Sequence, residues 1–76
     1  MNCTTLDTVA MTNTIRIERA IARMTQQQLA EAVGVSRQTI NAIELCKYVP
    51  SAVLVLKIAK TFGKPVEEIF TLEEND

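Results

Sequence analysis

The 76 residues carry eight Lys and Arg, nine Asp and Glu, no histidine and two cysteines, and this length allows one domain with a single small core. Without histidine, and with Cys3 and Cys46 far apart, we expect two reduced thiols, no zinc or other metal site and no cofactor. No run approaches the roughly 20 apolar residues that span a bilayer and no signal peptide is evident, so we expect a cytoplasmic protein.

The N-terminal segment, residues 1–13, is rich in Thr and shows no clear period. It is expected to be a flexible extension before a domain at residues 14–76, and Met11 could equally be the start of translation. Helical periodicity begins at Thr14 and predicts a short amphipathic helix over residues 14–22, with Ile15, Ile17 and Ile21 in its apolar stripe.

The next two helices are bounded by capping signals. Thr25 and Gln28 form a T-x-x-Q capping box that predicts a helix over residues 26–33. Gly34 can take the positive φ that ends a helix, and Ser36 can cap another helix over residues 37–44. Two helices joined by a sharp turn are therefore expected here.

The last third of the chain contains two further helices. Ser51 predicts the cap of a helix that ends at Gly63, and Pro65 begins a short helix at residues 66–70. A short strand over residues 70–72 then precedes the acidic end. The expected fold is all-α, a compact five-helix bundle with a possible C-terminal strand. The expected buried face of the fourth helix is Leu54, Leu56, Ile58, Ala59 and Phe62.

The spacing of apolar residues around the turn is that of a helix-turn-helix. Ala30, Gly34, Ile40 and Ile43 stand where such a motif needs a small contact residue, a left-handed turn residue and inward-facing side chains. With both isoleucines inward, the opposite side of the second helix of the motif presents amide and guanidinium groups, which bind base edges in DNA. The side chains on that face are Arg37, Gln38 and Asn41, with Ser36 at its start.

These residues resemble the phage repressor and Cro-type helix-turn-helix proteins, also called the xenobiotic-response-element (XRE) type. The resemblance rests on T-Q-x-x-L-A at residues 25–30, G-V-S-R-Q-T-I at 34–40, I-E at 43–44 and K-Y-x-P-S at 47–51. It implies a prokaryotic lambda-repressor-like domain that binds double-stranded DNA as a dimer, with residues 37–44 in the major groove. It implies base contacts from Ser36, Arg37, Gln38 and Asn41, phosphate contacts from Gln26, Thr39, Lys47 and Tyr48, and a structural ion pair between Arg19 and Glu44.

The chain departs from the family at Leu45 and Cys46, where the family usually has a turn pair such as Asn-Gly. This turn must therefore close on a residue with a Cβ. A reactive role for Cys46 beside the DNA backbone is one alternative, and a half-buried bystander is the other. Tyr48 could likewise pack over the turn instead of contacting phosphate. The lysines at 57, 60 and 64 are expected to be solvated charges.

Charge is divided along the chain. Residues 1–66 hold all eight Lys and Arg against four acidic residues, a net +4, whereas residues 67–76 hold five acidic residues, a net −5. The net charge of −1 therefore does not exclude DNA binding. One recognition helix covers few base pairs, so we expect a homodimer on two half-sites. Its interface is expected at Val66, Ile69, Phe70 and Leu72.

The sequence leaves three functional classes open. A DNA-binding transcriptional regulator, usually a repressor, is the first; an antitoxin or restriction-modification controller with an added protein partner is the second. The third is an interaction module that kept the fold without binding DNA, in which replacing Arg37 or Gln38 would leave activity intact. An enzyme is not expected, because there is no histidine, phosphate loop or paired carboxylates in a plausible cleft.

Overall fold

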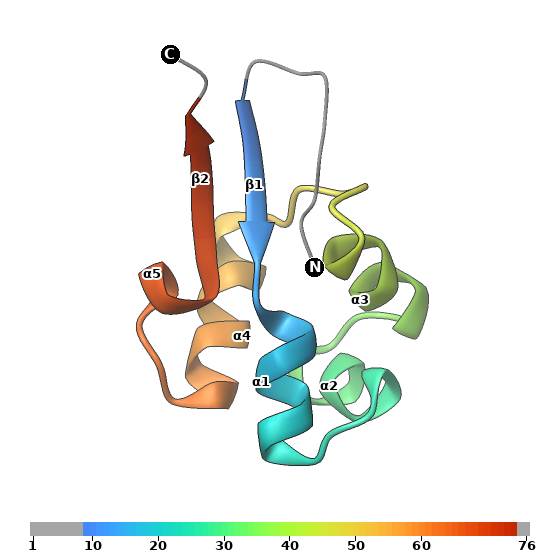
Figure 1. Cartoon of the computed structure of the whole chain (residues 1–76). Coiled ribbons are helices and arrows are strands. Elements are labelled where there is room, and N and C mark those ends of the chain that lie inside the picture. The colour runs from blue at the N-terminus through green and yellow to red at the C-terminus, as the bar shows by residue number, and fades with distance from the viewer. Residues whose placement is uncertain (1–8, 75–76) are drawn as a thin grey trace.

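Five helices lie between two strands in residues 9–74, which are the residues that the computed structural model describes (Figure 1). Within this part of the chain the longest helix has eleven residues, and none is long and apolar enough to cross a membrane. The elements are β1 (Val9–Asn13), α1 (Ile15–Ala22), α2 (Gln26–Val33), α3 (Arg37–Glu44), α4 (Ala52–Phe62), α5 (Val66–Ile69) and β2 (Phe70–Glu74).

The capping signals fix the helix boundaries as expected. Thr25 forms a complete capping box with Gln28, and the side chains of Ser36 and Ser51 accept hydrogen bonds from the third residues of α3 and α4. Gly34 and Gly63 close α2 and α4 in the left-handed conformation, with φ of 80° and 67°. The expected helices are therefore confirmed to within one residue at each end.

The two strands pair with each other in an antiparallel ribbon, with Val9 opposite Glu74 and Asn13 opposite Phe70. The expected C-terminal strand is confirmed and is longer than predicted. The expectation of a flexible segment up to residue 13 is wrong for Val9–Asn13, because these residues are hydrogen-bonded to β2. The rest of that segment, residues 1–8, lies outside the described residues.

The core is built from one face of each helix and the start of β2. Its buried apolar residues are Ile15, Leu29, Ala30, Val33, Ile40, Ile43, Leu54, Ile58, Ala59, Ile69 and Phe70. Leu56, expected in this core, is exposed, as are Ile17 and Ile21 of α1. Leu56 lies two residues from both Leu54 and Ile58, and Ile17 lies two residues from Ile15; two residues are about 200° on a helix, so these two face away from the core.

The turn after α3 closes on Cys46, which takes a left-handed φ of 59°. The expected closure on a residue with a Cβ is therefore confirmed. Cys46 is disulfide-bonded, so the expectation of a reduced thiol at this position is wrong. Cys3 lies outside the described residues.

Candidate nucleic-acid interface

α2 and α3 form the helix-turn-helix, on the side of the molecule away from α5 and β2 (Figure 1). Ile40 and Ile43 anchor α3 in the core. The opposite face of α3 exposes Arg37, Gln38 and Asn41 to solvent, as expected from the spacing. These side chains are accessible to a ligand, and their contact with DNA stays a prediction.

The angle between the two helices depends on the backbone at Gly34. Its φ is 80°, and the N–H groups of Gly34 and Val35 both donate to the carbonyl of Ala30, over 2.8 and 3.0 Å. Apart from the glycine itself and its chain neighbours, no atom lies within 4 Å of the place where a Cβ would stand. Glycine is therefore required for its left-handed conformation and not for space.

The expected ion pair joins α1 to the end of α3. Arg19 donates from Nε to Glu44 Oε2 over 2.6 Å and from Nη2 to Glu44 Oε1 over 3.1 Å. A third donation, from Arg19 Nη1, reaches the carbonyl of Met24 over 3.0 Å. Only 15% of the Arg19 side chain and 7% of the Glu44 side chain are exposed. The pair neutralises an acidic group beside the exposed face of α3, where phosphate would otherwise be repelled.

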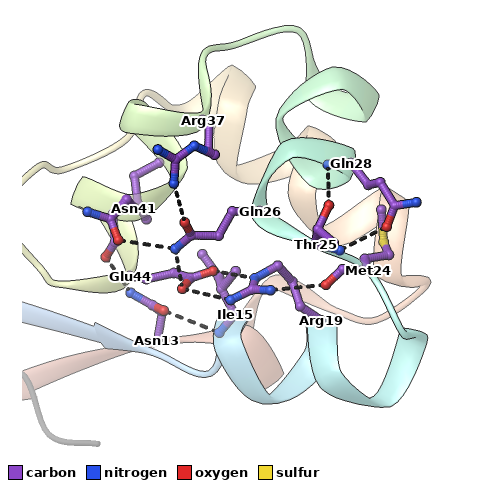
Figure 2. A network of polar contacts seen from close by, with 11 residues as sticks. Asn13, Ile15, Arg19, Met24, Thr25, Gln26, Gln28, Arg37, Asn41 and Glu44 are labelled. Carbon is purple, nitrogen blue, oxygen red and sulfur yellow. Dashed lines mark hydrogen bonds and ion pairs between the residues drawn. The ribbon is translucent and has the colours of Figure 1, made fainter.

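Gln26 extends this pair to the exposed side chains of α3 (Figure 2). Its Nε2 donates to Glu44 Oε1 and to Asn41 Oδ1, each over 3.1 Å. Its Oε1 accepts a longer bond of 3.5 Å from Arg37 Nη1. Both amide hydrogens of Gln26 are therefore used within the chain. The backbone N–H of Gln26, in the first turn of α2, is the group left for the phosphate contact that we expected.

Two hydroxyls at the start of α3 are also engaged. Ser36 Oγ accepts from the Thr39 N–H over 3.2 Å and lies 3.0 Å from Thr39 Oγ1. Thr39, Tyr48 and Lys57 line one shallow hollow at the turn of the motif. The structure therefore brings two expected phosphate-binding residues together and adds Lys57, which we had interpreted as a solvated charge. Lys47 is exposed in the same connection after α3.

Two polar residues on the other side of α3 were not singled out from the sequence. Asn13 Nδ2 donates to the carbonyl of Ile43 over 2.9 Å, and its Oδ1 accepts from the Ile15 N–H over 3.2 Å, so it ties β1 and α1 to α3. Arg16 is exposed and lines a polar hollow of about 230 Å³ together with Asn41 and Glu44. Arg16 is a candidate phosphate ligand, and its only sequence signal was its place three residues before Arg19.

Another ion pair lies away from this face. Glu18 is buried on α1, and Lys64 Nζ lies 3.0 Å from its carboxylate. Lys64 is therefore a structural partner of a buried acid and not the solvated charge that we expected. The pair ties α1 to the connection between α4 and α5.

The expected dimer surface is only partly accessible. Ile69 and Phe70 are 0% and 6% exposed, because their side chains complete the core of the single chain. The expectation that these two side chains form a dimer interface is therefore wrong. Leu72 is 63% exposed and Val66 is half-buried, so these two remain available to a partner.

Comparisons with known proteins agree on one family. A family profile described as helix-turn-helix matches residues 15–69. The uncharacterized HTH-type transcriptional regulator MJ0272 of Methanocaldococcus jannaschii is 50% identical over 66 residues, which are 87% of this chain and 100% of that protein. The uncharacterized HTH-type transcriptional regulator YgzD of Bacillus subtilis is 47% identical over 66 residues, again 87% of this chain and 100% of that protein.

A solved structure gives the same result. The crystal structure of a proposed DNA-binding protein from Bacteroides fragilis superposes with a TM-score of 0.72 at 28% identity, over 80% of this chain and 98% of that one. The resemblance inferred from the sequence motifs is therefore confirmed. The chain belongs to the XRE-type helix-turn-helix family of transcriptional regulators.

Proposed function

We propose that this chain binds a palindromic DNA operator as a homodimer and represses transcription by occluding a promoter in the cytoplasm. The observation that carries the proposal is the exposed face of α3, where a guanidinium and two amides project from a helix anchored by Ile40 and Ile43. In this proposal the protein binds DNA and catalyses no reaction. The relatives, named as HTH-type transcriptional regulators, support the same role.

The exposed face has the chemistry of a base reader. Arginine donates two hydrogen bonds to guanine, and glutamine and asparagine bind base edges through their amides. Arg37, Gln38 and Asn41 would therefore specify sequence, with Ser36 close to the bases or their sugars. Arg37 and Gln38 lie in the first turn of α3 and Asn41 one turn later, so all three are on one helix that could lie in the major groove.

Groups on both sides of α3 would hold the phosphates. On one side lie the backbone N–H of Gln26, at a helix N-terminus that favours anions, and the cation of Arg16. On the other side lie Thr39, Tyr48 and the connection that carries Lys47. Phosphate contacts of this kind set the position of the protein on the duplex without specifying sequence.

The short length of α3, the helix proposed to contact the bases, is the reason to propose a homodimer. α3 has eight residues and is therefore about 12 Å long, enough for only a few base pairs. Two such helices about 34 Å apart would read two half-sites on one face of the duplex. The exposed Leu72 on β2 and the half-buried Val66 are the residues proposed for the contact between copies.

Duplex binding measured by fluorescence anisotropy at several salt concentrations tests the proposal. The logarithm of the association constant should fall linearly with the logarithm of salt concentration, by about 0.9 per neutralised phosphate. Arg37→Ala should weaken binding to the preferred duplex by about 1–3 kcal/mol. Lys60→Ala, on the exposed surface of α4, serves as the control of equal charge change and should have little effect. A flat salt dependence, or equal losses in the two variants, contradicts the proposal.

A further inference from the structure

The hydrogen bonds around Gln26 determine which end of the Asn41 amide faces outward. A carboxylate only accepts hydrogen bonds. Because Glu44 Oε1 lies 3.1 Å from the end of the Gln26 side chain, that end must be the amide nitrogen. Glu44 is itself held by two donors of Arg19, at 2.6 and 3.1 Å. The ion pair therefore orients the Gln26 amide.

The oriented Gln26 amide in turn orients Asn41. The second hydrogen of Gln26 Nε2 points at Asn41 Oδ1 over 3.1 Å. Turning the Asn41 amide over would place two N–H₂ groups against each other, which removes one hydrogen bond and adds a repulsion. In Figure 2 the amide nitrogen of Asn41 accordingly points away from Gln26. Arg19 therefore fixes the position of Glu44, Glu44 fixes the orientation of the Gln26 amide, and Gln26 fixes the orientation of the Asn41 amide.

We infer that Asn41 presents its N–H₂ group to the DNA and favours guanine or thymine, whose polar groups in the major groove are acceptors only, over adenine, which also carries the N6 donor. The inference rests on the proposed DNA binding and refines it. Asparagine pairs with adenine by donating to N7 while its oxygen accepts from N6. Here the oxygen is turned towards Gln26 and the amide nitrogen away from it, so the amino group of adenine would face a donor. Guanine O6 and N7 and thymine O4 are acceptors in the major groove.

Arg37 strengthens this bias because it lies one helical turn before Asn41 on the same face. Arginine is a donor only. Two neighbouring side chains of α3 therefore both donate, so each half-site should favour guanine or thymine, which carry acceptors and no donor in the major groove, at the two positions they contact. Gln38 is exposed, and its amide has both a donor and an acceptor, so it can read either kind of edge.

Selection of bound duplexes from a random pool tests the inference with the full-length chain. The native chain and Asn41→Ala are selected in parallel, and the position whose preference is lost in Asn41→Ala is the base that Asn41 contacts. The native chain should show guanine or thymine there. In Gln26→Met, which has a side chain of similar length without the amide, Asn41 can turn over and pair with adenine. The ratio of adenine to guanine at that position should then rise at least about fivefold.

Gln27→Met is the matched control. Gln27 is the next residue of α2, and its side chain donates to Glu31 over 3.0 Å, so it takes no part in the hydrogen bonds that orient Asn41. The duplexes selected by Gln27→Met should therefore show the same consensus as those selected by the native chain. A native consensus with adenine opposite Asn41 overturns the inference and leaves the proposed function standing. So does a Gln26→Met variant that folds and keeps the native preference, or an Asn41→Ala variant that loses no preference. The absence of any consensus refutes the proposed function itself. If Gln26→Met does not fold, the native consensus alone decides.

Discussion

Replacing Glu44 by methionine removes the carboxylate that joins α1, α2 and α3 while keeping an apolar side chain of similar length. It leaves Arg19, whose side chain is 15% exposed, with its bond to the Met24 carbonyl but without its counter-ion. It also takes an acceptor from Gln26. Breaking one partner of a buried ion pair costs about 3–5 kcal/mol. Because part of Arg19 reaches water, we expect a loss of about 3 kcal/mol, at the low end of that range.

This loss is large for a chain of 76 residues. At about 0.05–0.15 kcal/mol per residue, the whole free energy of unfolding is about 4–11 kcal/mol. The midpoint of thermal unfolding should fall by about 12–24 °C, since each kcal/mol shifts a domain of this size by about 4–8 °C. The Glu44 variant should therefore be folded but close to the limit of stability.

Equilibrium unfolding in urea measures the effect in a double-mutant cycle with Arg19→Met. Replacing both partners by apolar residues leaves no buried charge, so the double variant should lose clearly less than the sum of the single variants. Glu31→Met, on the exposed surface of α2, is the control and should change stability by no more than about 0.5 kcal/mol. If the double variant loses the sum of the two single losses, or if Glu44→Met is as stable as Glu31→Met, the ion pair does not stabilise the fold in this way.

Three further changes test other parts of the structure. Gly34→Ala should destabilise the fold by about 1–2 kcal/mol from backbone strain alone, because nothing lies within 4 Å of the new Cβ, and urea unfolding measures this. Arg23→Gly should be more stable than Arg23→Ala by about 1 kcal/mol in the same assay, since Arg23 closes α1 with a φ of 59°; equal stability of the two would contradict the assigned conformation. Leu72→Glu should shift sedimentation equilibrium towards monomer without lowering the unfolding midpoint, and an unchanged dimer would exclude this surface.

The helix boundaries could be predicted because each depends on local chemistry. Thr25, Ser36 and Ser51 cap helices with their own hydroxyls, and Gly34 supplies a conformation that other residues avoid. These signals lie within a few residues of the structure they produce. The pairing of Arg19 with Glu44 was expected from the family resemblance, and the structure contains it.

The parts that could not be predicted depend on contacts between distant segments. β1 has no strong period of its own and is a strand because β2, some 60 residues later, pairs with it. Ile69 and Phe70 were expected in a dimer contact, but α5 and β2 direct their side chains into the core of the same chain. Gln26 was expected to face phosphate with its side chain, and only the three-dimensional position of Glu44 shows that its amide is held inward.

The exposed face of α3 and its flanks are the surface that we propose binds duplex DNA. Titration of the isotopically labelled chain with a selected duplex, followed by amide chemical shifts, tests it directly. We expect the largest shift changes at Ser36–Asn41 and in the first turn of α2, with smaller changes at Lys47 and Tyr48. Changes concentrated on α4 or α5, with α3 unaffected by saturating duplex, would contradict it.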